Sequence, residues 1–180
     1  MTITRGGGVL IAVRNELSAV KLDLSSRGFD MLKTIDIVGA KCWVNHSCFF
    51  IFVIYVQPKT LVRDYALLFN LLTDLNELYD QHVLIIGNFN IPKYDGDLDN
   101  RAIGNNKLFE LNTMVKFFNF VQFNKVANNN ETFLGLVLSN QQSEDYLLSE
   151  DLHHPSLLII LTYQSSKTKV IAKSESSKSQ

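Results

Sequence analysis

The sequence has almost no net charge, and this absence limits the possible partners. Its 180 residues carry 17 basic and 18 acidic side chains, for a formal net charge of −1. A chain without a positive excess lacks the electrostatic footprint that drives non-specific binding to phosphate backbones. If a nucleic acid is the partner, recognition must therefore be local.

Long hydrophobic runs are also missing. The most apolar stretch, FFIFVIYV at 49–56, is far shorter than the roughly 18 residues of a membrane span, and the opening MTITRGGG lacks the apolar core of a secretory signal. We therefore expect a soluble, intracellular protein without a membrane partner. The sequence does not separate nucleus from cytoplasm, and it leaves the oligomeric state open.

Cysteine is scarce. Cys42 and Cys48 are the two cysteines, and His46 lies between them. A structural zinc site needs four ligands, and no fourth ligand lies nearby in the sequence. We interpret both cysteines as reduced thiols, in the core or at the surface.

The residues that are present suit one packed domain, since 46% of them are hydrophobic. Apolar residues recur at spacings of three and four from Val62 to Tyr79 and from about Lys107 to Phe118, which predicts two helices, each with one buried face. Runs of β-type residues predict strands at 6–13, near 34–40, one or two within 42–56, and at 82–90, 119–122, 133–138 and 157–163.

The order strand, helix, strand predicts mixed α/β layering. We assign residues 1–163 to a single domain and the serine- and lysine-rich residues 164–180 to a disordered tail.

Two glycine- or acid-rich stretches imitate ligand-binding loops. RGGG at 5–8 precedes a predicted strand, whereas a phosphate-binding loop follows a strand and opens a helix. DGDLD at 95–99 has acids at alternate positions, but a calcium loop that begins at Asp95 would need Gly at Asn100 and Glu at Asn106. We interpret RGGG as a structural chain entry and DGDLD as a solvated loop.

Six motifs follow one another along the chain: RGGGVLIAV, IYVQP, LIIGNFNIP, FNKVANNN, LGLVLSN and DLHHPSL. In this order and at these intervals they resemble the endonuclease/exonuclease/phosphatase domain of non-LTR retrotransposons, from about Arg5 to Leu158. The resemblance implies a DNase I-like, four-layer α/β/β/α sandwich with two packed β-sheets inside. It also implies DNA as the partner and cleavage of phosphodiesters with a divalent metal, usually Mg²⁺.

The resemblance assigns roles to four residues. The family's Gly-Asp-Phe-Asn motif falls on Gly87 to Asn90, so Asn88 replaces the aspartate that activates water or holds the metal, and Asn90 matches the asparagine that orients the phosphate. Tyr55 matches the tyrosine whose hydroxyl supports the phosphate. His153 matches the catalytic histidine of the closing motif.

Several positions depart from the family pattern. Gly135 and Leu152 stand where the family has aspartates, the first of which orients the histidine. The family's opening strand and its metal-binding glutamate precede the segment that RGGG matches, so we expect a sandwich that is incomplete at the N-terminus.

Mg²⁺ sites depend on carboxylates, and a lost general base lowers the rate by about 10² to 10⁴. We therefore expect a degenerate, retrotransposon-derived endonuclease-like domain that does not bind Mg²⁺ tightly and is inactive as this chain. An active Mg²⁺-dependent DNA endonuclease and a nucleic-acid-binding module that does not cut remain the alternatives.

Overall fold

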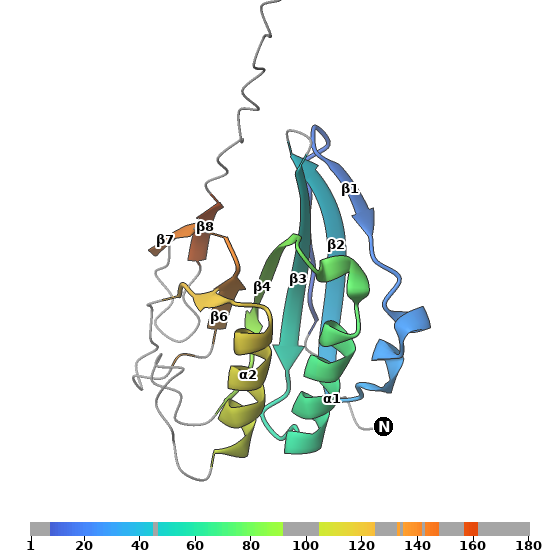
Figure 1. Cartoon of the computed structure of the whole chain (residues 1–180), viewed down its shortest axis with the longest axis vertical. Helices are drawn as coiled ribbons and strands as arrows, with labels where there is room; N and C mark the ends of the chain where they lie inside the picture. The colour runs from blue at the N-terminus through green and yellow to red at the C-terminus, as the bar shows by residue number, and fades with distance from the viewer. Residues whose placement is uncertain are drawn as a thin grey trace, which may run out of the picture.

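The described part of the protein is built around a six-stranded sheet with two helices on one face, in a computed structural model (Figure 1). The structure describes residues 8–44, 47–91, 105–124, 133, 135–141, 143–147 and 157–161. The strand order in the large sheet is β1-β2-β3-β4-β6-β5, and β7 and β8 form a separate two-stranded sheet.

The strands are β1 (Ser18–Lys21), β2 (Ile35–Val44), β3 (Ser47–Val56), β4 (His82–Asn88), β5 (Val121–Gln122), β6 (Gly135–Ser139), β7 (Ser143–Leu147) and β8 (Leu157–Leu161). The helices are α1 (Val62–Thr73) and α2 (Asn106–Phe117), and three 3₁₀ turns cover Ser25–Arg27, Phe29–Met31 and Asn76–Leu78. The expected mixed α/β class is confirmed.

The centre of the sheet is built from β2, β3 and β4. β2 and β3 form a long antiparallel hairpin, and β4 lies parallel to β3 after the chain has crossed over through α1. β3 is rich in aromatic and β-branched residues, which suits a strand that is covered on both faces. The predictions of strands near 34–40, within 42–56 and at 82–90 are confirmed.

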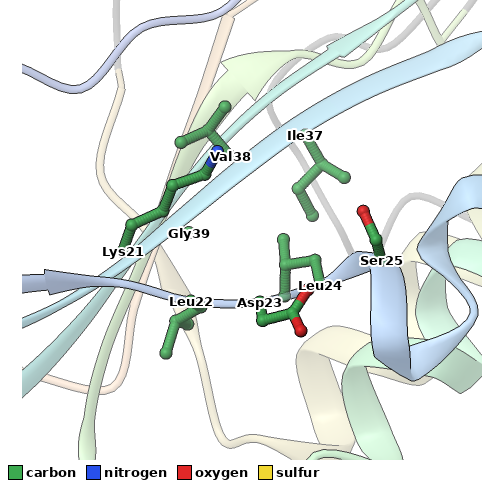
Figure 2. A pocket seen from close by; sticks show the side chains of 8 residues that line it. All are labelled: Lys21, Leu22, Asp23, Leu24, Ser25, Ile37, Val38 and Gly39. Atoms are coloured by element: carbon green, nitrogen blue, oxygen red, sulfur yellow. The ribbon is translucent and has the colours of Figure 1, made fainter.

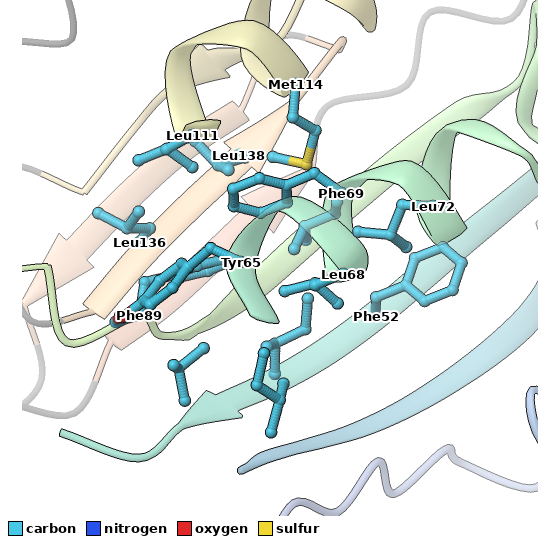
Figure 3. Close-up of a cluster of buried hydrophobic side chains, with 14 of the residues drawn as sticks. Phe52, Tyr65, Leu68, Phe69, Leu72, Phe89, Leu111, Met114, Leu136 and Leu138 are labelled. Atoms are coloured by element: carbon cyan, nitrogen blue, oxygen red, sulfur yellow. The ribbon is translucent and has the colours of Figure 1, made fainter. Parts of the chain in front are cut away.

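Side chains alternate between the two faces of the sheet. On the helix side, Phe50, Phe52 and Ile54 of β3 join the buried faces of α1 and α2 in one core (Figure 3). On the other side, Phe49, Leu84 and Val137 are also buried but do not belong to that core. An apolar sheet with two apolar faces calls for a second layer, as a sandwich provides.

The first predicted helix is shorter than expected. α1 ends at Thr73, and the chain continues through a 3₁₀ turn at Asn76–Leu78 instead of reaching Tyr79 as one helix. Leu75 and Leu78 are nevertheless buried, at 3% and 1% exposure. The turn keeps both side chains facing the core, so the apolar spacing persists although the helix does not.

The strand predicted at 6–13 is wrong for its described part, because residues 8–13 belong to no ladder. The composition of this segment is β-type, but a strand forms only where a neighbour supplies hydrogen-bond partners. The first strand of the sheet is β1. The sequence does not predict it, because the strand is only four residues long and all four residues are exposed. β7 was also missed.

Candidate functional site

Three of the positions selected from the sequence lie in one row across the sheet. Tyr55 at the end of β3 is the register partner of Asn88 in β4, and Asn88 is the partner of Gly135 at the start of β6. Register partners lie on the same face of a sheet. This face is the one turned away from the helices, because Ile54 and Val56, the neighbours of Tyr55, lie in the helix-side core.

The chain leaves β4 through a tight turn that is built by its own amides. The backbone N–H of Asn90 donates to the side-chain Oδ1 of Asn88 at 3.0 Å, which is the hydrogen bond of an Asx turn. Asn90 itself has φ 46°, in the left-handed region that Asn tolerates better than most residues. The two amides therefore determine how the strand ends.

The Asx turn decides which part of Asn88 remains available. The Oδ1 atom accepts from Asn90, and the Nδ2 amide has no hydrogen-bond partner among the residues that the structure describes. The hydroxyl of Tyr55 next to it likewise has no partner among them. The row thus offers hydrogen-bond donors at the point where the resemblance places a metal-holding carboxylate.

Asn90 has a structural role in this geometry. Its Nδ2 donates to the backbone carbonyl of Val56 at 2.5 Å and so ties the end of β4 to the end of β3. This bond uses one of the two N–H groups of the Asn90 amide. The role in orienting a phosphate that the resemblance implies for Asn90 stays a prediction.

A buried tyrosine, which the sequence reasoning placed only on a helix face, supports the same turn. Tyr65 of α1 is fully buried, and its hydroxyl donates to the carbonyls of Phe89 at 2.5 Å and Asn90 at 3.3 Å. Figure 3 shows its ring beside Phe89. Burial raises the pKa of Tyr65 well above its usual range. The hydroxyl therefore stays protonated and continues to donate to the turn.

Asp36 extends the row to a fourth strand. It is the β2 register partner of Tyr55, lies on the same face, and makes no hydrogen bond or ion pair among the described residues. The alternation in TIDIVGA shows a polar residue on one face of a strand, but only the register reveals which residue it faces. The sequence reasoning therefore did not select Asp36.

Gly135 occupies the opposite end of the row. Asn124, which is buried, donates its Nδ2 to the carbonyl of Gly135 at 2.5 Å and joins the FNKVANNN motif to β6. Among the described residues, a Cβ added at Gly135 would meet no heavy atom closer than 3.8 Å. The position where the family has an aspartate therefore has room for a side chain.

The donor set does not fit Mg²⁺. Asp36 is the only carboxylate in the row, and it lies two strands from Asn88, or about 10 Å at the usual strand spacing. The row therefore brings no pair of carboxylates together at one point. Within the described residues, no group of three His, Cys, Asp or Glu side chains is placed to hold a metal.

Some selected residues lie outside the described part of the chain. These are His153 with its neighbours, His46, and the DGDLD loop at 95–99. The structure thus brings together Tyr55, Asn88 and Asn90, and it does not test the role of His153. The tail at 164–180 is likewise not described.

The two cysteines lie on opposite faces of the β2–β3 hairpin. Cys42 is the partner of Phe49, whereas Cys48 is the partner of Trp43, one position along. Both are free thiols, as expected, and burial together with the nearby Cys48 raises the pKa of Cys42. Side chains on opposite faces do not share a metal ion.

Comparison with known proteins gives a fold and no closer relationship. No protein-family model matches the sequence, and no curated protein matches it. Among solved structures, the chain is similar to the endonuclease domain of TRAS1, a telomere-specific non-LTR retrotransposon, with a TM-score of 0.58 and 11% identity over 84% of this chain and 72% of that one. It also matches beta toxin from Staphylococcus aureus, with a TM-score of 0.42 and 13% identity over 67% of this chain and 52% of the toxin.

The likeness to the TRAS1 domain shows a DNase I-like α/β fold, as the motifs predicted. At this identity it does not extend to activity or ligands. None of the described helices has both the length and the apolar character needed to span a membrane.

Proposed function

We propose that this chain is a degenerate endonuclease-like domain, derived from those of non-LTR retrotransposons, that does not cleave DNA with a metal of its own. The fold and the six motifs support the relationship. The loss of function is inferred from the row Asp36, Tyr55, Asn88 and Gly135, in which an amide and a glycine replace two family aspartates.

The observation that carries this proposal is the orientation of the Asn88 amide. Its oxygen is bound to the Asn90 N–H, and the group left over is a donor, which repels a cation. A hydrolytic site of this class needs anionic oxygens to hold the metal and polarise a water. Asn88 supplies no charge, and its one side-chain oxygen already accepts a hydrogen bond from the protein.

A nicking assay on supercoiled plasmid with Mg²⁺ or Mn²⁺ tests the proposal. We expect no nicking by the wild-type chain above the level of a His153→Ala variant prepared in parallel. Nicking that survives in His153→Ala reports a contaminating nuclease. Nicking that disappears in this variant would show that the chain is an active enzyme and would overturn the proposal.

Gain of metal binding gives a second, independent measurement. Asn88→Asp keeps the shape of the side chain and one oxygen for the turn, and it adds a charged oxygen to the row. We expect Mn²⁺ binding, followed by calorimetry, to appear or tighten in Asn88→Asp. The matched control is Asn76→Asp, which makes the same change at an exposed residue before β4, at the other end of the strand.

A second candidate function, binding of nucleic acid without cleavage, is favoured by two donors in the row that have no partner among the described residues. The Asn88 amide and the Tyr55 hydroxyl suit phosphate oxygens. If this site binds duplex DNA, affinity falls with salt, and Asn88→Asp weakens binding by about tenfold or more because a charge replaces a donor. Binding that Asn88→Asp and Asn76→Asp weaken equally would place the contact elsewhere.

A further inference from the structure

The edge of β2 that faces away from β3 is only partly used. β1 pairs with it at Ala40–Trp43, and the N–H of Leu22 adds one bond to Gly39 O at 2.9 Å. Beyond Gly39, no described strand pairs with this side of β2. The first four residues of β2 therefore form an open sheet edge.

The existing hydrogen bonds show which backbone groups point outward. The N–H of Gln57 donates to Thr34 O at 3.0 Å, so the even-numbered residues of β2 face β3 and the odd-numbered residues face the open edge. The N–H and C=O of Ile35 and Ile37 and the N–H of Gly39 point outward, and none has a hydrogen bond among the described residues. Such a row is a template for another strand.

A groove follows the same edge (Figure 2). One hollow of about 290 Å³ lies between residues 21–25 and residues 37–39. A second, of about 350 Å³, shares Leu24, Ser25, Ile37 and Val38 with the first and continues along β2 to Gly8 and Val9. The outward backbone groups therefore lie beside two neighbouring hollows with four lining residues in common, and residues 8 and 9 of the same chain line the second.

The segment that starts there has the features of a strand without a partner. Val9, Ile11 and Val13 are half-buried while Leu10 and Ala12 are exposed, which is the alternation of an extended chain. Leu10 is 82% exposed. No backbone group of residues 9–13 makes a hydrogen bond among the described residues.

The connection to β1 fixes the direction of this segment. A turn with the bond from Leu17 N–H to Arg14 O at 3.0 Å reverses the chain before β1. Because β1 runs antiparallel to β2, the segment before the turn runs parallel to β2. Four residues of β2 separate Gly39 from Trp43, about 13 Å. The five steps from Val13 to Ser18 span up to about 17 Å only when extended, so docking requires the bond from Leu17 N–H to Arg14 O to open.

We propose that residues 9–12 dock into this groove as an additional strand of the large sheet, parallel to β2 along Ile35–Val38. Docking supplies partners to two rows of backbone groups that have none in the part of the chain that the structure describes. It also places apolar side chains on both faces of a sheet that is apolar on both faces. The covalent tether favours this segment over one from another molecule by raising its effective concentration.

The docked strand would border the candidate site. Asp36 lies at the β2 end of the row that contains Tyr55 and Asn88, and Gly8 and Val9 line the same hollow as Asp36. Docking therefore completes the sheet next to Asp36 on its open side. This inference stands on the sheet edge alone and does not depend on the proposed function.

Amide hydrogen exchange of the ¹⁵N-labelled full chain tests the proposal. A parallel edge strand bonds through every second residue, so we expect alternate amides of residues 9–12 to exchange at least about tenfold more slowly than their neighbours. The outward amides of Ile35, Ile37 and Gly39 should be protected as well. Unprotected exchange of both sets in the wild-type chain would overturn the proposal.

A pair of variants tests the link between the two sets. Ile11→Asp should release the amides of Ile35, Ile37 and Gly39 by about tenfold or more while β3 stays protected. Val20→Asp, the control on exposed β1, should leave them unchanged. Equal effects of the two variants argue against docking. If Ile11→Asp unfolds the chain, the alternating pattern of protection in the wild type decides.

Dilution of the wild-type chain tests a second copy as the occupant of the groove. Protection that disappears on dilution, together with a dimer in light scattering, would assign the groove to a second copy and overturn docking within one chain.

Discussion

At the scale of single residues, side-chain amides hold the strand ends that the motifs identify. Asn88 accepts from the N–H of Asn90, and Asn90 donates to Val56. Both amides are therefore used within the protein, where a metal-dependent site of this class would use oxygens toward a ligand. An amide side chain has a donor group and an acceptor group, and in Asn88 the acceptor is turned toward the backbone of the protein.

Asn90 combines a left-handed backbone with a side-chain hydrogen bond, so two substitutions separate its contributions. Asn90→Ala loses the bond to Val56 and strains a residue at φ 46°, and we expect it to lower the free energy of unfolding by about 2 kcal/mol. Asn90→Gly loses only the bond and should cost about half as much. Urea unfolding measures both; equal losses would show that φ contributes nothing.

At the scale of secondary-structure elements, two glycines differ in the space that the neighbouring strands leave for a side chain. A Cβ at Gly87 of β4 would clash with the backbone oxygen of Ile54 on β3, which cannot move aside as the end of a flexible side chain can. A Cβ at Gly135 of β6 would lie 3.8 Å from the nearest atom, in ordinary contact. Gly87 is therefore required by the close approach of two strands, and Gly135 is not.

We expect Gly87→Ala to lower the free energy of unfolding by about 3 kcal/mol, because β3 and β4 must move apart. Gly135→Ala is the matched control, since it adds the same methyl group to a neighbouring strand. It should raise the stability by about 0.5 kcal/mol, because alanine loses less conformational freedom on folding than glycine does. Chemical denaturation of both variants checks the signs, and a stable Gly87→Ala protein would contradict the close approach of the two strands.

At the scale of the whole molecule, Tyr65 connects the helix layer to the site. Its ring lies in the core between α1 and the sheet, and its hydroxyl donates to the turn after β4 (Figure 3). The Tyr65 side chain therefore contacts both the core and the turn at the candidate site. A substitution at this residue affects both.

The raised pKa of Tyr65 predicts a loss of stability in alkali. The native state keeps the phenolic proton at pH values where the unfolded chain, with an ordinary tyrosine pKa near 10, releases it. The contribution is complete below about pH 10 and declines as the pH rises above that value. We expect the urea midpoint to fall there more steeply in the wild type than in Tyr65→Phe. Tyr79→Phe, which removes an exposed phenol, is the control, and an unchanged slope in Tyr65→Phe would contradict this contribution.

The sequence by itself determined the elements whose signals are local. The spacing of apolar residues in 62–73 and 106–117 and the β-type runs of β2, β3 and β4 specify helices and strands without reference to the rest of the chain. The motifs likewise indicated the DNase I-like fold, which the likeness to the TRAS1 domain shows. These elements can be predicted from the sequence because periodicity and composition depend on neighbouring residues.

Only the tertiary structure decided what depends on strand pairing. The register places Asp36 beside Tyr55 and Asn88 beside Gly135, and it leaves residues 8–13 without a ladder despite their β-type composition. The hydrogen bond from the Asn90 N–H to the Asn88 oxygen likewise appears only in the folded turn. A strand needs partners that are distant in sequence, and a side chain's free atoms depend on its neighbours, so neither can be read from residues taken in order.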